Sequence, residues 1–186
     1  MSDTGMLPEL FQRKVEAELA RANSLVRGAS DNAIAGERFP CVAFVKGIPG
    51  PAELSGAPVM SGPDGEAAAK AIERLGFDPG STFAVFCRPT SDATDNDVAS
   101  RLRQVLEAVD PVTIIATDDE ARDDLGRAFG VDLAFGRPIE LHGRVALAVD
   151  GLEASLVDDS RKRRVWRQMK ELDPRHALDS STKRRS

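Results

Sequence analysis

The sequence predicts a single α/β domain built on a parallel β-sheet, and two observations carry this prediction. Four short apolar runs lack polar alternation, as expected of strands that helices cover on both faces. These runs alternate with segments whose apolar residues recur at three- and four-residue spacing, the pattern of amphipathic helices. Such alternation implies right-handed crossovers between parallel strands. The chain of 186 residues has the length of one domain.

The N-terminal part is expected to form one helix and a surface segment. Apolar residues recur at helical spacing through residues 7–26, which predicts a helix with a single buried face. Residues 27–38 are polar and contain glycine, so they are expected to run over the surface. Residues 1–38 are therefore assigned to the same domain as the segment that follows.

The first two strands flank a long loop and a helix. Residues 41–45 form the first apolar run, and a loop rich in Pro and Gly continues to Gly65. The alanine-rich helix that follows is expected to end at Gly76, a residue common after a helix C-terminus. Residues 82–87 form the second predicted strand.

Helix boundaries are also visible in the next repeat of the pattern. Thr94 is expected to cap the N-terminus of a helix, because its hydroxyl can accept a hydrogen bond from a free amide. Residues 112–116 form the third strand. Asp118 or Asp119 is expected to begin the next helix, which ends at Gly130. Two adjacent carboxylates here could suggest a magnesium site, but a favourable interaction with the helix dipole explains them more simply.

The last part of the chain contains one more strand and one more helix. Residues 145–149 form the fourth strand, and a helix is expected from about Ser160. Residues 39–172 are thus assigned to one α/β unit and residues 173–186 to a flexible tail. In such folds ligands lie beyond the carboxyl ends of the strands.

Composition restricts the classes of function. No apolar stretch is long enough to span a membrane, so no membrane partner is expected. Cys41 and Cys87 are too few for a disulfide framework or a thiolate metal site, which favours a reducing cytoplasm and predicts no metal ion or cofactor. The net charge of −5 argues against strong non-specific DNA binding, although a local basic groove remains compatible with it.

Several short motifs appear in a defined order along the chain. Residues 44–50 have the sequence Phe-Val-Lys-Gly-Ile-Pro-Gly, and residues 87–89 have Cys-Arg-Pro. Asp110-Pro111-Val112 and the closing segment 162–166, Lys-Arg-Arg-Val-Trp, follow. In sequence and spacing this set resembles the uracil-DNA glycosylase superfamily, with the bacterial iron–sulfur type closest. The resemblance implies a three-layer α/β/α sandwich with a four-stranded parallel sheet, and DNA whose target base is flipped into a pocket.

The departures from the family pattern are as informative as the matches. Gly47 stands where the family has its acidic residue, and Phe83 where it has the Asn that reads uracil. The stacking aromatic is replaced by Val59 or Met60, and the late His by Gly151. Loss of one such electrostatic contact typically costs about 10²–10³ in rate. The resemblance therefore implies a pocket without the usual catalytic groups.

Only Cys87 matches a ligand of the family's iron–sulfur cluster, so no cluster is expected. The resemblance places one group of residues at the former base pocket and another against DNA phosphates, although a solvated helix face also explains the second group. The pocket group is Gly47, Ile48, Pro49, Gly50, Met60, Phe83 and Gly151, and the phosphate group is Arg161, Lys162 and Arg163.

Three hypotheses follow for the function. In the first, the protein is a non-catalytic relative that binds single-stranded DNA or another protein in the old cleft. In the second, it is an active DNA glycosylase that acts on uracil-containing or other DNA with altered specificity and a relocated acid, either Asp150 or Glu53. Asp150 also suits an ordinary loop or capping role. In the third, the chain is an unrelated α/β domain that shares only Gly-Pro turns.

Overall fold

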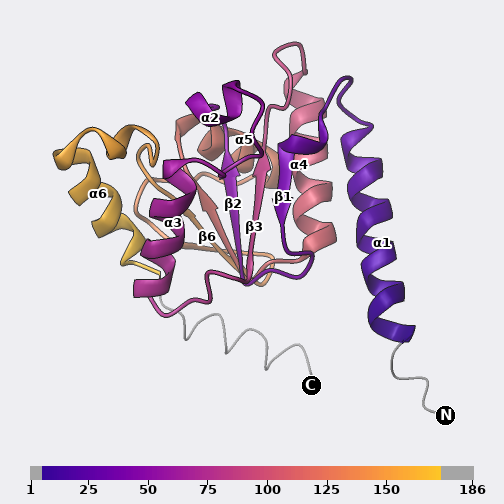
Figure 1. Ribbon diagram of the computed structural model, residues 1–186, viewed down its shortest axis with the longest axis horizontal. Coiled ribbons are helices and arrows are strands. Elements are labelled where there is room, and N and C mark those ends of the chain that lie inside the picture. The colour runs from indigo at the N-terminus through magenta and orange to yellow at the C-terminus, as the bar shows by residue number, and fades with distance from the viewer. Residues whose placement is uncertain (1–5, 173–186) are drawn as a thin grey trace.

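A computed structural model describes residues 6–172 and contains one six-stranded sheet with helices on both sides (Figure 1). The α/β class predicted from the sequence is confirmed. The strand order is β1-β3-β2-β4-β6-β5. The strands are β1 (Ile34–Gly36), β2 (Val42–Lys46), β3 (Thr82–Phe86), β4 (Thr113–Ala116), β5 (Ile139–Leu141) and β6 (Arg144–Ala148).

The sheet is mixed, which differs from the four-stranded parallel sheet expected from the sequence. The four central strands β3, β2, β4 and β6 run parallel, whereas β1 and β5 pair antiparallel to the two outer members of this set. β1 lies within the segment that was expected to be a surface loop. Gly36 permits its close pairing, because a Cβ added there would lie 2.3 Å from the carbonyl oxygen of Thr82.

The helices form a layer on each face of the sheet. α1, α4 and α5 pack on one face, and α3 and α6 pack on the other, while the single-turn helix α2 covers the carboxyl end of β2 (Figure 1). Short 3₁₀ turns lie at Asp31–Ala33 and Ala154–Leu156. The helices are α1 (Met6–Asn23), α2 (Pro51–Leu54), α3 (Pro63–Arg74), α4 (Asp95–Val109), α5 (Asp119–Phe129) and α6 (Asp159–Met169).

The two faces of β2 illustrate how the core is divided. Ala43 and Val45 belong to the apolar cluster shared with α1, α4 and α5, whereas Val42 and Phe44 belong to the cluster shared with α3 and α6. Side chains alternate along a strand, so the next residue in the second set is Lys46. The last residue of β2 therefore points into the layer that contains α3 and α6.

Predicted helix ends agree with the structure at two positions. The Thr94 hydroxyl accepts a hydrogen bond from the amide of Asp97 at the start of α4, as predicted. Gly130 ends α5 in a left-handed conformation, also as predicted.

The N-terminal helix is only partly buried. Val15, Leu19 and Ala22 are buried against the domain, but Leu10 and Phe11 are more than half exposed. The single buried face predicted for this helix therefore holds only for its C-terminal part.

Within residues 6–172, none of the helices combines the length and the apolar character needed to cross a bilayer. The segment 173–186, for which a flexible tail was predicted, lies outside the described residues.

Candidate functional site

A buried lysine lies at the carboxyl end of β2. Lys46 is 1% exposed, and its Nζ contacts three carboxylates. The distances are 2.9 Å to Glu53 Oε1, 2.5 Å to Asp64 Oδ2 and 3.1 Å to Glu153 Oε2. We call these four residues the Lys46 cluster. An ammonium has three donors, and all three are used here.

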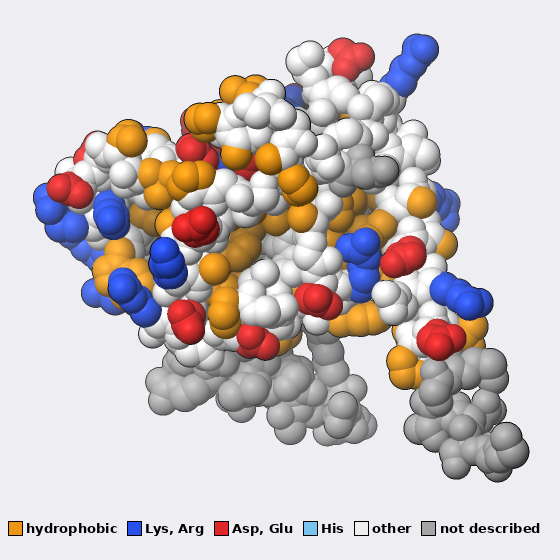
Figure 2. Space-filling model, viewed as in Figure 1, with side chains coloured by type: hydrophobic (Ala, Val, Ile, Leu, Met, Phe, Trp, Pro, Cys, Tyr) orange, Lys and Arg blue, Asp and Glu red, His pale blue; other side chains and the backbone are white. Residues whose placement is uncertain are grey.

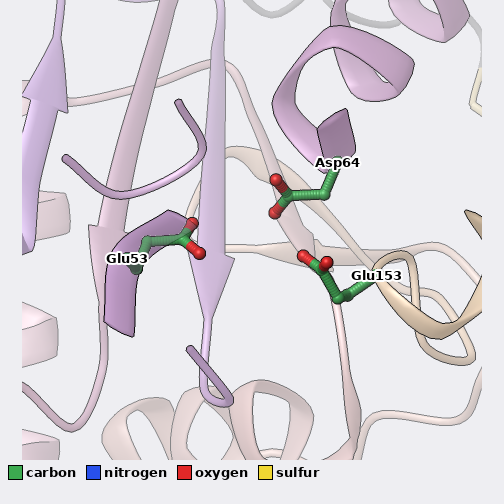
Figure 3. A group of neighbouring side chains, drawn as sticks. All are labelled: Glu53, Asp64 and Glu153. Atoms are coloured by element: carbon green, nitrogen blue, oxygen red, sulfur yellow. The ribbon is translucent and has the colours of Figure 1, made fainter. Parts of the chain in front are cut away.

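The three carboxylates come from separate segments that converge at one point (Figure 3). Glu53 lies on α2, Asp64 in the first turn of α3, and Glu153 in the loop between β6 and the following 3₁₀ turn. One oxygen of each carboxylate lies within 4.8 Å of the others. The positions of Glu53 and Asp64 at helix starts favour negative charge, because free amides gather there.

Glu53 also organises the loop between β2 and α3. Its Oε2 accepts a hydrogen bond from the amide of Gly50 at 2.9 Å, and its Oε1 accepts one from the amide of Met60 at 2.9 Å as well as one from Lys46. Both oxygens are therefore engaged, and the side chain is 2% exposed. Glu53 acts as a structural clamp and is poorly placed to serve as the relocated acid.

Burial and charge oppose each other at Lys46. Burial alone would lower the pKa of its ammonium, but hydrogen bonds to Asp64, Glu53 and Glu153 outweigh burial and raise that pKa above its ordinary value of 10.5. Because the pKa of Lys46 is higher in the folded protein than in the unfolded chain, its ammonium contributes its full stabilisation at every pH below the pKa of the unfolded chain. That contribution is lost only as the pH rises through the higher folded value. Lys46 therefore carries its positive charge at neutral pH.

On the other side of the loop, Asp118 fixes the main chain that follows Lys46. Its Oδ2 accepts hydrogen bonds from the amides of Gly47 at 3.0 Å and Ile48 at 3.2 Å, while its Oδ1 caps α5 through the amide of Ala121 at 2.8 Å. Asp118 is therefore the N-cap of α5 and a clamp on the loop, which accounts for this carboxylate without a metal ion.

This contact leaves no room for a side chain at Gly47. A Cβ added there would lie 2.5 Å from the Cβ of Glu120 and 2.7 Å from the amide nitrogen of Ala121. Real Cβ atoms essentially never come so close to backbone. The position at which the resemblance places an acid is therefore closed by the start of α5.

The other acid candidate, Asp150, is tied to α6. Its carboxylate pairs with Arg164, and its amide donates to Gln168 Oε1 at 2.9 Å. Gly151, the position of the family's His, adopts a left-handed conformation with φ of 73° that a residue with a side chain would find strained. A Cβ added to it would lie 2.9 Å from the guanidinium of Arg161.

The structure instead places Glu153 at the Pro49-Gly50 turn. A Cβ added to Gly50 would lie 2.5 Å from Glu153 Oε2, so the carboxylate touches the turn. Its side chain is 34% exposed, in contrast to Glu53 and Asp64 at 2% each. Sequence reasoning missed Glu153 because it lies 107 positions from Lys46, with no local motif that connects the two.

An apolar cavity of about 240 Å³ lies between β1, β3 and the loop before α3, and none of the four residues of the Lys46 cluster lines it. Met60 and Phe83, both predicted pocket residues, border it together with Phe44, Val59 and Ala69. Met60 has a left-handed backbone with φ of 58°. Phe83 borders the cavity from β3, although its side chain belongs to the apolar cluster on the opposite face of the sheet. Met60 and Phe83 therefore border the same cavity, but the ring of Phe83 is directed to the other face of the sheet.

A second hollow of about 330 Å³ lies between α3 and α6, and we call it the basic groove. Lys70, Arg74, Lys162 and Trp166 line it together with one acidic residue, Glu66, above an apolar floor that includes Val165. Leu152 and Pro63 also line it, and they are the chain neighbours of Glu153 and Asp64. The groove is therefore lined by residues next in sequence to two members of the Lys46 cluster, although no member of the cluster lines it.

Basic residues are concentrated on α6. The helix has five basic residues and one acidic residue, and Figure 2 shows basic side chains gathered over it. Lys162 and Arg163, predicted to contact phosphates, are exposed, and Arg161 is partly exposed. Asp158 accepts hydrogen bonds from the amides of Ser160 and Arg161 and caps the helix.

Comparisons with known proteins give no relative from which a function could be inferred. A scan against protein-family models finds no match to this chain, and a search of curated proteins also finds none. What the protein does is therefore inferred from the Lys46 cluster, the cavity and the basic groove.

Replacing the buried ammonium tests the role of the Lys46 cluster. We expect Lys46→Met to lower the free energy of unfolding by about 3–5 kcal/mol at pH 7, because the buried carboxylates of Glu53 and Asp64 and the partly exposed one of Glu153 lose their counter-charge. Urea denaturation at pH 7 measures the effect. Lys70→Met, an exposed control, should change stability by less than about 0.5 kcal/mol. An equal effect of the two substitutions would contradict the assignment.

A second substitution tests whether the position of Gly47 is closed. We expect Gly47→Ala to lower the free energy of unfolding by about 1–3 kcal/mol, because the added methyl group meets the backbone of α5. Chemical denaturation checks this. Gly80→Ala is the matched control, since its added Cβ meets only the flexible end of Asp78 at 3.2 Å. A Gly47→Ala protein as stable as this control would show that the site has space for a side chain.

Proposed function

We propose that this protein is a divergent relative of the uracil-DNA glycosylase superfamily that binds single-stranded DNA and does not excise uracil. The observation that carries the proposal is the closed position at Gly47, where a Cβ would lie 2.5 Å from Glu120 and 2.7 Å from the backbone of Ala121. In the family that the motifs resemble, this position supplies the acid. A protein that keeps the order of the family's motifs but has no room for the acidic side chain could still bind DNA without cleaving it.

The location of the candidate surfaces supports a binding role. The Lys46 cluster lies at the carboxyl end of β2, the edge at which open α/β sheets bind ligands. The loop that borders this edge is held on one side by Glu53 and on the other by Asp118. A site held in this way loses little conformational freedom when a ligand binds.

The basic groove supports nucleic acid as the ligand. Proteins that bind single strands without strong sequence preference combine a positively charged groove with aromatic side chains on which bases stack. Here Arg74 and Lys162 supply positive charge, Lys70 pairs with the lining residue Glu66, and Trp166 supplies an aromatic ring in the same groove. These basic residues stand out in a chain with a net charge of −5.

Another protein is the competing ligand. Three large apolar side chains lie exposed on segments that follow β2 and β6: Ile48 at 47%, Leu54 at the end of α2 at 74%, and Val157 at 93%. Exposed apolar groups of this kind are typical of protein interfaces when they form a patch. The basic groove beside them favours the nucleic acid.

An active glycosylase is the second candidate function, and one observation favours it. Glu153 is a partly exposed carboxylate against the Pro49-Gly50 turn, which is the surrounding in which the family's acid acts. In this alternative Glu153, rather than Asp150 or Glu53, is the relocated acid. It would stabilise the cationic sugar as the base leaves.

Base excision on labelled oligonucleotides separates these two functions. We expect no uracil-dependent cleavage of single- or double-stranded DNA, even with stoichiometric protein, relative to matched thymine controls. Cleavage that Glu153→Gln abolishes would replace the proposal with the glycosylase alternative. Cleavage that survives this substitution would contradict both assignments of the site.

DNA binding is tested on the same single strands by fluorescence anisotropy. We expect the wild-type protein to bind. The double variant Lys162→Gln/Arg163→Gln should bind more weakly, with the slope of log K against log salt reduced by about 0.7 for each lost phosphate contact. Arg13→Gln removes an exposed positive charge on α1, on the other face of the sheet, and should leave binding unchanged. Absence of binding, or equal loss in Arg13→Gln, would contradict the proposal.

A further inference from the structure

We propose that α1 and the neighbouring end of α4 form the surface through which two copies of this chain associate, with their α1 helices side by side and antiparallel. The proposal goes beyond DNA binding and does not depend on it, because α1 and α4 pack on the face of the sheet opposite the basic groove. Three observations carry it: an apolar patch that the domain leaves uncovered, two hollows beside the patch, and charges that complement one another across a two-fold axis.

The apolar patch lies at the N-terminal half of α1. Leu10 is 52% exposed, Phe11 is 56% exposed, and Phe39, in the loop between β1 and β2, is 58% exposed. Val15, one turn after Phe11, is already buried against the domain. The first turns of α1 extend beyond the other helices (Figure 1). The apolar side of the helix therefore continues past the part of the domain that covers it, as expected where another molecule completes the packing.

Phe11 and Phe39 border two hollows on this side of the molecule. One, of about 560 Å³, extends between Pro8 and Ser81, and the other, of about 310 Å³, lies between α1 and α4. An aromatic side chain that projects beside a hollow can make a surface self-complementary. A two-fold axis places the projecting ring of each copy against the hollow of the other, so the same patch serves both copies.

The side of α1 next to α4 also carries charges without partners. Spacings of three or four residues place a run of four side chains on this side of the helix: Phe11, Lys14, Glu18 and Arg21. Lys14 and Glu18 line the hollow between α1 and α4, and within residues 6–172 neither makes an ion pair. Over its length α1 has three acidic and three basic residues, so it carries no net charge although the chain carries −5. Two such helices therefore approach without net repulsion.

An antiparallel arrangement of two α1 helices pairs these groups. With the two-fold axis beside Glu16, Lys14 of one copy faces Glu18 of the other, and Phe11 faces Arg21. Each contact occurs twice by symmetry. Lys14 and Glu18 attract each other through opposite charge, and a guanidinium over an aromatic ring adds a cation–π contact. A parallel pair in register would instead bring Lys14 against Lys14 and Glu18 against Glu18.

The match between positions of a single helix identifies the partner as a second copy. Each of these side chains has its complement on the same surface, whereas a partner that carries one sign of charge would meet either Lys14 or Glu18 with a like charge. The patch is small, since interfaces of stable complexes have about 20–30 residues on each side. We therefore expect a reversible dimer with a dissociation constant in the micromolar range.

Sedimentation velocity from about 1 µM to about 1 mM protein, in the absence of DNA, tests the proposal. We expect monomer at the low concentration and dimer at the high one. Phe11→Gln should weaken association at least about tenfold, because a few aromatic side chains commonly dominate the energy of an interface. Val157→Gln is the matched control, since it removes an apolar side chain that is 93% exposed just before α6, and it should associate as the wild type does.

Charge exchange tests the antiparallel register. Lys14→Glu and Glu18→Lys should each weaken the dimer at least about tenfold, because each places like charges opposite one another at two points. The two substitutions together should restore the dimer, since the ion pairs form again with their signs exchanged.

A protein that stays monomeric at about 1 mM, or a dimer that Phe11→Gln leaves unchanged, would overturn the proposal. A double variant as weak as the single variants would overturn the pairing of Lys14 with Glu18. Because these measurements contain no DNA, either result leaves the proposed DNA binding to its own test.

Discussion

The ammonium of Lys46 holds together the segments that lie over the carboxyl end of β2. From the last residue of β2 it binds α2 and the first turn of α3, which follow it closely in the sequence, and the loop after β6, where Glu153 lies 107 positions away. Each of these segments brings a carboxylate, and without the ammonium their mutual repulsion would separate them. The path of the chain over the carboxyl end of β2 therefore depends on one side chain. The same contacts bring Glu153 against the Pro49-Gly50 turn.

A second contact limits what this region can do. Asp118 draws the main chain at Gly47 and Ile48 against the start of α5, while Glu53 holds Gly50 and Met60 on the other side. The loop is thus attached to two layers of the sandwich. Such attachment gives a rigid border for a bound molecule, and it also removes the space in which an acid would act. The hydrogen bonds to Asp118 thus both hold the loop in place and close the position at Gly47.

Much of the fold was predictable because burial determines it locally. Continuous apolar runs marked all four central strands, and residues such as Thr94 and Gly130 marked helix ends. β1 and β5 were missed because three-residue edge strands carry little apolar pattern, and pairing rather than burial defines them. The Lys46 cluster was missed because lysine at a strand end usually indicates solvent. One signal was present. Lys46 lies two and four residues after Phe44 and Val42, so its side chain points to the same buried face of the sheet.

The short edge strands have a consequence for behaviour in concentrated solution. A sheet edge with unpaired amides and carbonyls invites a strand from another molecule, and long flat edges promote aggregation. In this protein β1 and β5 occupy the two edges, and each is only three residues long. Little continuous backbone is left for an incoming strand to extend. The four parallel strands therefore have a short strand on each side, and the sheet offers little template for fibril growth.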